Sequence, residues 1–233
     1  MSKRIVVKIG GSVLYDANLD INFSVLKKFK DWYIQHKEEY EKIVIVTGGG
    51  MLSREIQRKM EGSVTEKEYQ HNIAMSITQT NAAIIQGYLE DFDSYMPRRL
   101  GDAYEFLNEE KNRTLISGGL KVGWSTDMDA AIFADMLDVD TVYKVSDIDH
   151  VYDVDPNSNP NAKPLIDLTW VEYSGLFNIT DEVDHEANKN IPIDVTCAKF
   201  CLKKGISFFI CGGDSLKEKS TVEEILQTGT LIH

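Results

Sequence analysis

The sequence has little cysteine, little basic charge and no long apolar run. Its three cysteines, Cys197, Cys201 and Cys211, are odd in number and lack the paired spacing of a zinc site, so we interpret them as buried free thiols. No run approaches the roughly 18 apolar residues that a membrane span needs, and the opening residues, MSKRIVV, lack the apolar stretch of a signal peptide. We therefore expect a cytoplasmic protein with no membrane partner.

Acidic residues outnumber basic ones. The chain holds 37 Asp and Glu against 25 Lys and Arg, which gives a formal net charge of -12 and an isoelectric point near 4.9. Nucleic-acid-binding proteins usually present a basic face, so this balance argues against a nucleic-acid partner. An anionic ligand must instead be met by a local site. With 233 residues, 42% of them hydrophobic, the chain is long enough to bury a sizeable core, as one large domain or as two closely joined lobes.

Short β-branched runs alternate with segments of helical periodicity. The pattern predicts strands at 5–10, 42–48, 113–119, 141–148 and 206–213. It predicts helices at 23–41, from about Ser53, at 72–92, 126–138 and 198–205, with a turn-rich loop at 155–165 and no assignment for 91–112. Such alternation is typical of an α/β fold with three layers, an αβα sandwich around an open, mainly parallel sheet. Ligands of such sheets lie beyond the carboxyl ends of the strands.

Four of the predicted strands end in glycine, at Gly10-Gly11, Gly48-Gly49-Gly50, Gly118-Gly119 and Gly212-Gly213. In a parallel sheet these ends share one edge, where glycine lets the backbone and its N–H groups approach an anion. Each pair could instead make only a tight turn. Lys8 stands two residues before the first pair, and a lysine there could stabilise a transferring phosphoryl group. Neither the P-loop nor the dinucleotide-binding glycine motif is present. We therefore predict a phosphate site of another type.

Five segments carry a resemblance to a known family: VVKIGGS, VTGGGMLSRE, SGGLKVGWSTDMDAAIFAD, KVSDIDHVYDVDPNSNPNAK and PIDVTCAKF. In this order they resemble the amino acid kinase superfamily, and within it the uridylate kinases of the compact, archaeal-like prokaryotic type. The combination of GWSTD with SDIDHVYDVDP is the most specific part. The resemblance implies an ATP- and Mg²⁺-dependent kinase that converts UMP to UDP, an acceptor-binding part at about 1–125, an ATP-binding part at about 126–233, and a homo-oligomer, commonly a hexamer.

The resemblance also implies roles for individual residues. Lys8 would bridge the donor and acceptor phosphates beside Gly10 and Gly11, and Asp149 would lie near the reaction centre and orient Lys8. The acceptor side would comprise Gly48, Gly49, Arg54, His71, Thr126 and Asp127. The ATP side would comprise Ser12, Ser146, Asp147, Tyr152 and Asp155. Two alternatives stay open: Asp127 could only cap a helix, and the residues from Pro156 onward read equally well as a turn.

Several positions depart from the family pattern. His71-Asn72 stand where related uridylate kinases place an aspartate that binds ribose, His150 stands where glycine is usual, and Asp147 where asparagine or lysine is usual. The segment EANKNIPID replaces a glycine-rich phosphate loop and leaves Lys189 as a candidate donor-phosphate ligand. These departures leave room for a sister kinase of a carboxylate, carbamate or isopentenyl phosphate, or for a non-catalytic nucleotide- or oxyanion-binding protein similar to the molybdenum storage proteins. The isopentenyl phosphate alternative is the weakest, because VTGGGMLSRE lacks the histidine that those relatives carry.

Overall fold

The computed structural model describes residues 3–180, 191–213 and 228–233. Its main feature is a seven-stranded sheet in the order β3-β2-β1-β4-β8-β9-β7. The strands are β1 (Lys3–Ile9), β2 (Tyr40–Thr47), β3 (Thr114–Ser117), β4 (Thr141–Ser146), β7 (Asp167–Leu168), β8 (Ser207–Gly212) and β9 (Gly229–Ile232). The first five in the sheet order are parallel, and β9 joins β8 antiparallel.

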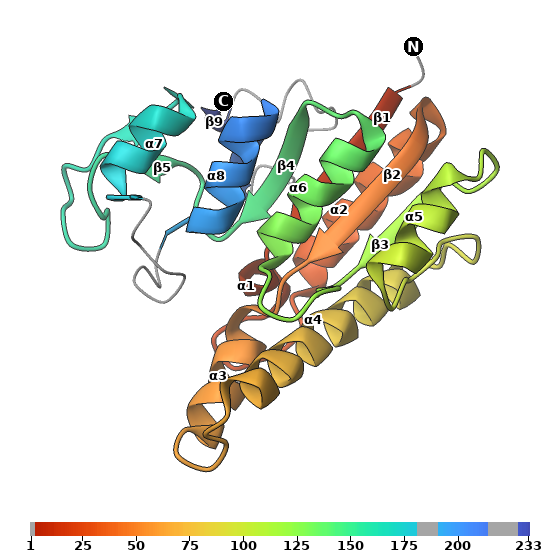
Figure 1. The fold of residues 1–233 in the computed structure, drawn as a ribbon, viewed down its shortest axis with the longest axis horizontal. Helices are drawn as coiled ribbons and strands as arrows, with labels where there is room; N and C mark the ends of the chain where they lie inside the picture. Colours follow the sequence, from red (N-terminus) through yellow and green to blue (C-terminus); the bar gives the residue numbers. More distant parts are fainter. Residues whose placement is uncertain (1–2, 181–190, 214–227) are drawn as a thin grey trace.

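Helices cover both faces of this sheet (Figure 1). They are α1 (Gly11–Leu14), α2 (Phe23–His36), α3 (Gly50–Met60), α4 (Lys67–Leu89), α5 (Leu100–Asn108), α6 (Thr126–Leu137), α7 (Trp170–Leu176) and α8 (Val195–Lys204), with a short 3-10 turn, Lys37–Glu39, after α2. Helices α1, α2 and α4 pack in one core and α5 to α8 in the other. No helix among the described residues is long and apolar enough to cross a membrane.

Successive side chains of β1 point to opposite faces of the sheet, which explains why its apolar residues are mostly β-branched and consecutive. Ile5, Val7 and Ile9 lie in the core with α2 and α4, while Val6 lies in the opposite core with α6. Because both faces are covered, both sets of side chains are buried, and the strand reads as a continuous apolar run. The sheet is therefore the middle layer of an αβα sandwich, which confirms the predicted fold class.

Several predicted boundaries were wrong for local reasons. The helix predicted over 23–41 ends at His36, because Tyr40 already begins β2. Helix α3 begins at Gly50 rather than near Ser53, and α4 begins at Lys67. The unassigned stretch 91–112 contains α5. The loop at 155–165 connects β5 (Val151–Tyr152) to β6 (Pro164–Leu165), which pair antiparallel outside the main sheet. Strand β9, which lies between β8 and the edge strand β7 and is antiparallel to β8, was not predicted.

The carboxyl ends of the parallel strands meet at one edge of the sheet. Helix α3 and the first half of α4 extend beyond this edge (Figure 1), so they stand beside whatever binds there. Position Lys8 of β1 pairs with Lys144 of β4 and Val46 of β2 in register. The topology thus brings two lysines from distant parts of the chain to the same level of the sheet.

Candidate active site

A cavity of about 380 Å³ opens at the carboxyl edge of the sheet. Its lining comes from the ends of β1, β2 and β4 and the starts of α1, α3 and α6: Lys8, Gly10, Gly11, Ser12, Gly48, Gly49, Gly50, Arg54, Thr126, Asp127, Lys144, Ser146, Asp147, Ile148, Ile191 and Pro192. This is the edge where open α/β sheets bind ligands. Most of the residues predicted for the phosphate site therefore lie together.

Two glycine loops form one wall of the cavity by direct backbone contact. A Cβ atom on Gly11 would overlap the backbone of Gly48 to Gly50, and a Cβ on Gly50 would overlap the backbone of Gly11. Gly50 also has φ +57°, a conformation that side chains rarely adopt. Glycine is required at both positions, since only its small size lets the turns after β1 and β2 meet.

The other two glycine pairs serve packing instead of the cavity. A Cβ on Gly118 would lie 2.5 Å from backbone atoms of Thr78 and Gln79 in α4, and one on Gly212 would lie 3.3 Å from Asp149. The cavity lining contains glycines from β1 and β2 only. The prediction that four glycine ends build one anion cradle is therefore wrong for β3 and β8, where glycine permits close approach of neighbouring segments.

A buried carboxylate joins two lysines on the cavity floor. Lys8 Nζ lies 3.1 Å from Asp127 Oδ1, and Lys144 Nζ lies 2.8 Å from Asp127 Oδ2. The three residues are 6%, 8% and 5% exposed in the order Lys8, Asp127 and Lys144. Lys144 also donates to the carbonyl of Pro192. Two ammonium groups on one carboxylate leave a net positive charge where a phosphate would sit.

The electrostatics of this triad follow from its burial. Burial alone would raise the pKa of Asp127, but Lys144 and Lys8 outweigh it and hold this pKa below its usual value. Burial lowers the pKa of Lys8, against the attraction of Asp127. Asp127 is thus an ionised partner for both lysines, and its carboxylate fixes their positions.

The start of α6 is set by Ser125, not by Asp127. The Ser125 hydroxyl accepts from Met128 N at 3.0 Å and donates to the carboxylate of Asp194. Asp194 in turn caps α8 by accepting from Thr196 N and Cys197 N at 3.0 and 3.1 Å. The alternative that Asp127 only caps a helix is excluded. Thr126 and the amino end of α6 therefore face the cavity, with the partial positive charge of a helix N-terminus.

Further polar side chains line the cavity. Arg54 on α3 is exposed and lines the cavity, so its guanidinium is available to an acceptor phosphate. Ser146 ends β4 and donates to Asp147 Oδ1 at 3.1 Å. Ser146, Asp147 and Ser12 all line the cavity, and their assignment to the ATP side stays a prediction.

Asp149 does not hold Lys8. Its carboxylate accepts from Tyr152 OH at 2.9 Å and lies 3.4 Å from His150 Nδ1, and its side chain is 60% exposed. The prediction that Asp149 orients Lys8 is corrected: that contact belongs to Asp127. Asp155 accepts from Asn157 N at 2.9 Å, the contact of a turn. Neither Tyr152 nor Asp155 lines the cavity.

His71 also stands apart from the cavity lining. His71 is exposed in the first part of α4 and does not line the cavity. Lys189 lies outside the described residues. His150 contacts Asp149 and the ring of Tyr152, whose centroid is 6.3 Å from its own. The roles of His71 and Lys189 that the resemblance implies stay predictions.

The described residues offer no ready-made metal site. No group of three or more His, Cys, Asp or Glu in the described ranges could hold an ion. Of the two carboxylates that line the cavity, Asp127 is engaged by the lysines, and Asp147 is exposed. The donor set fits a Mg²⁺ ion that arrives on a nucleotide, with Asp147 as the available protein oxygen, since Mg²⁺ in such sites is bound by one or two carboxylates and substrate phosphates.

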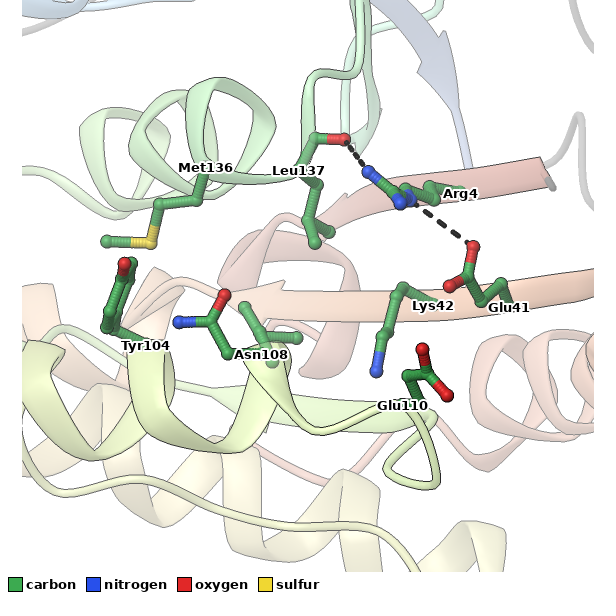
Figure 2. Close-up of a pocket in the computed structure, with 9 residues that line it drawn as sticks. Arg4, Glu41, Lys42, Tyr104, Asn108, Glu110, Met136 and Leu137 are labelled. Atoms are coloured by element: carbon green, nitrogen blue, oxygen red, sulfur yellow. Dashed lines mark hydrogen bonds and ion pairs between the residues drawn. The ribbon is translucent and has the colours of Figure 1, made fainter. Parts of the chain in front are cut away.

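A second cavity, of about 230 Å³, lies at the opposite edge of the sheet, among Arg4, Lys42 and α5 (Figure 2). Its two basic side chains are already engaged. Arg4 contacts Glu41 at 3.4 Å and the Leu137 carbonyl at 3.0 Å, and Lys42 donates to the carbonyls of Glu109 and Asn112 at 2.5 Å. These contacts tie strand starts to the ends of α5 and α6, so we assign them to stability.

Fold and site together define a class: an α/β protein that handles a phosphate or similar anion at the carboxyl edge of its sheet, over a buried lysine pair. The chain belongs to the amino acid kinase family, whose model matches residues 3–212. It is 32% identical over 232 residues to a uridylate kinase of Thermococcus kodakarensis, covering 98% of this chain and 99% of the relative. It is 31% identical over 213 residues to a uridylate kinase of Pyrococcus abyssi, covering 90% of each chain.

Two solved structures share the fold. A uridylate kinase of Archaeoglobus fulgidus superposes with a TM-score of 0.74 at 21% identity, covering 98% of this chain and 100% of that one. A UMP kinase of Bacillus anthracis superposes with a TM-score of 0.77 at 20% identity, covering 99% and 96%. The seven-stranded sheet and its helical layers are thus those of a known kinase fold.

Proposed function

We propose that this protein transfers the γ-phosphoryl group of ATP to UMP, giving UDP and ADP, as a step in pyrimidine nucleotide synthesis. The observation that carries the proposal is the Lys8–Asp127–Lys144 triad on the floor of a glycine-walled cavity. Membership of the amino acid kinase family supports the use of ATP, and the names of the relatives support UMP as the acceptor.

In this proposal the reaction depends on electrostatic stabilisation and on the positioning of the two substrates. A UMP phosphate oxygen would attack the γ-phosphoryl group in line, and an ionised phosphate needs no general base. Lys8 and Lys144 would stabilise the charge that spreads over the transferring group, with the Gly10 and Gly11 backbone closing over it. Arg54 would hold the acceptor phosphate, and Ser146 and Asp147 would face the donor. Mg²⁺, when bound to ATP, would neutralise the phosphates, and Asp147 is the residue placed to approach it.

We propose that the two substrates bind to different parts of the chain. We assign the acceptor to the part at about 1–125 together with Thr126, and ATP to the part at about 126–233. The resemblance favours a homo-oligomer, commonly a hexamer. Light scattering measures the mass of the protein in solution, and the mass of a monomer would contradict the proposed homo-oligomer.

The decisive experiment is ADP release from ATP and Mg²⁺ with one acceptor at a time: UMP, CMP, glutamate, aspartate, carbamate or isopentenyl phosphate. We expect fast release with UMP and, with Lys8→Ala, loss of that release. Release with another acceptor would identify a sister kinase. Tight ATP binding without release in the presence of any acceptor would support a binding or storage protein and overturn the proposal.

A further inference from the structure

A second buried carboxylate lies beneath the loop that leads into the site. Asp129, on the first turns of α6, is 0% exposed, and neither of its oxygens has a hydrogen-bond partner of good geometry within the described ranges. Burying an unpaired carboxylate is costly, so such a residue calls for an explanation in the surrounding structure. The triad does not use it, and it does not line the cavity.

The surroundings of Asp129 belong to the loop 118–125 and to α4. A Cβ atom on Gly119 would lie 3.8 Å from Asp129 Oδ2, 3.3 Å from Thr78 Oγ1 and 3.3 Å from Met75 Cγ. Gly119 N donates to Thr78 Oγ1 at 2.7 Å, and that hydroxyl donates to the Met75 carbonyl at 2.6 Å. The proton of the Thr78 hydroxyl is thus already donated to the Met75 carbonyl and is not available to Asp129. The Leu120 backbone N–H is the donor that approaches the carboxyl.

Charged groups on the elements around α6 are occupied elsewhere or exposed. On the neighbouring strands, Lys8 and Lys144 contact Asp127, while Arg4 and Lys42 are engaged by Glu41 and by backbone carbonyls. Lys204 of α8 contacts Asp135. Lys121 of the loop lies over the Trp124 ring, with its Nζ 4.1 Å from the ring centroid. Lys199 donates to the Thr180 carbonyl, the Lys203 side chain is exposed on α8, Cys197 and Cys201 face each other, and His71 is exposed on α4. A neutral carboxyl therefore suits this environment better than an ionised one.

The loop connects this buried group to the site. It starts at Gly118, which packs against α4, and ends at Ser125, whose hydroxyl caps α6 and so sets where Thr126 and Asp127 face the cavity. We propose that Asp129 is a positioning residue for the acceptor side of the site: its protonated carboxyl lets the loop at Gly119 and Leu120 pack over it, and ionisation displaces the loop because the buried charge needs water. This inference rests on the proposed function for its kinetic consequence, but not for the titration itself.

The direction of the effect can be worked out. Burial raises the pKa of Asp129 to about 7, against a smaller opposing effect of the Leu120 N–H. Between the ordinary value of 3.8 and about 7, the unfolded chain has lost a proton that the folded chain keeps, so stability falls as pH rises through this window and levels off above it. Above about 7 the folded protein carries an unpaired buried charge, and the loop moves to hydrate it.

The test compares Asp129→Asn with the wild-type protein and with Asp135→Asn. The asparagine is neutral at every pH and has the shape of the protonated acid, while Asp135 is a carboxylate on the outer face of the same helix, paired with Lys204 at 2.8 Å. The KM for UMP is measured from about pH 6 to pH 8.5. Taking the ratio of the wild-type KM to the variant KM cancels the titration of the UMP phosphate itself, whose second pKa is about 6.

We expect the wild-type KM to rise about tenfold relative to that of Asp129→Asn across this range, with kcat changed less, an effect in the range of ordinary coupling between two sites. The KM of Asp135→Asn should have the same pH dependence as that of the wild type. If the KM of Asp129→Asn follows the wild-type profile, the proposal is overturned. If the asparagine variant fails to fold, Asp129→Ser replaces it with the same expectation.

A readout without turnover separates this proposal from the proposed function. Trp124 lies in the loop, so its fluorescence, identified by comparison with Trp124→Phe, should change through about pH 7 in the wild type and stay constant in Asp129→Asn. If no acceptor supports ADP release but this fluorescence transition is present, the proposed function is wrong and the proposal that Asp129 controls the loop is supported. If the wild type shows no fluorescence transition, the proposal that Asp129 controls the loop is wrong, whether or not the protein releases ADP.

Discussion

Lys8 and Lys144 occupy paired positions on the adjacent parallel strands β1 and β4, and their ammonium groups contact the two oxygens of one buried carboxylate, that of Asp127. Neither lysine could take this position alone, because an unpaired buried charge is costly. The shared carboxylate offsets part of that cost and leaves the excess positive charge facing the cavity. The site is therefore preorganised for an anion before any ligand binds.

Replacing either lysine should affect the chemical step more than acceptor binding. We expect Lys8→Ala and Lys144→Ala each to lower kcat by about 10²- to 10³-fold, the usual loss when one preorganised donor is removed, with a much smaller rise in the KM for UMP. Steady-state kinetics with varied UMP measures both. Lys204→Ala, which removes an exposed ion pair with Asp135, is the matched control and should leave both constants unchanged.

Because the two lysines share one partner, their effects should not add. The double variant is expected to lose far less than the product of the single losses, as found for groups that act as a unit. Equal losses in kcat and in UMP affinity in the single variants, or full additivity in the double variant, would contradict the role of the triad in the transition state.

Removing the shared carboxylate should destabilise the fold at neutral pH. Asp127→Asn leaves two buried ammonium groups without a counter-charge, for which we expect a loss of about 3 to 5 kcal/mol in the free energy of unfolding. The pKa of Asp127 is held below its usual value, so its stabilisation is present above the unfolded value of 3.8 and is lost as pH falls through the lower folded value.

Urea unfolding of Asp127→Asn and wild type at pH 7 and at about pH 3 measures this difference. The gap between the two proteins should be large at pH 7 and smaller in acid, below the unfolded value of 3.8, because there the unfolded wild-type chain binds a proton at Asp127. A variant as stable as the wild type at pH 7 would show that Asp127 is not the partner that makes the lysine pair tolerable.

Arg54 and Arg58 offer a matched pair on one helix. Arg54 lines the cavity, whereas Arg58 is held on the surface by Glu55 through contacts of 3.0 and 2.7 Å. If Arg54 holds the acceptor phosphate, Arg54→Ala should raise the KM for UMP by about tenfold or more, the cost of losing a charge-assisted contact of about 1.5 to 3 kcal/mol, and leave the KM for ATP nearly unchanged. Arg58→Ala should change neither. The same rise for both substrates would place Arg54 elsewhere in the mechanism.

The sequence predicts the layers of this fold because each layer has a local signal. Lys8 is recognisable because it ends a β-branched run just before two glycines, and Gly50 because it follows the next such run. Lys144 carries no comparable signal: a lysine inside TVYKVS reads as an exposed residue of a strand, and its burial appears only when β4 is placed beside β1. The contact of Asp127 with both lysines depends on the same pairing, which local sequence does not determine.

Other elements escaped prediction because their stabilisation is not local. Helix α5 is nine residues long and buries only Ala103 and Leu107, so few apolar positions mark it in the sequence. Strand β9 is four residues long and depends on β8 for its pairing. Gly118 and Gly212 gave the same signal as the cavity glycines, yet they serve close packing against α4 and Asp149. A glycine after a strand indicates close approach, and only the tertiary structure shows what approaches.

The last prediction concerns the contact between the two glycine turns. Gly50→Ala would place a methyl group into the Gly11 backbone and would force a side chain into a left-handed conformation, so the turns after β1 and β2 would have to separate. We expect a loss of about 3 kcal/mol or more in the free energy of unfolding, from overpacking and backbone strain together. Since Lys8 and the Gly10–Gly11 turn lie on the same strand end, kcat should fall as well.

Gly87→Ala provides the opposite case in the same protein. Gly87 is exposed inside α4, and a Cβ there meets nothing within 4 Å, so alanine should stabilise the helix by about 0.5 to 1 kcal/mol without altering kinetics. Thermal unfolding of both variants, with steady-state rates on the same samples, measures the contrast. If Gly50→Ala were as stable and active as the wild type, the turns would have to be free to move apart, and the wall of the phosphate site could not be the rigid backbone contact described above.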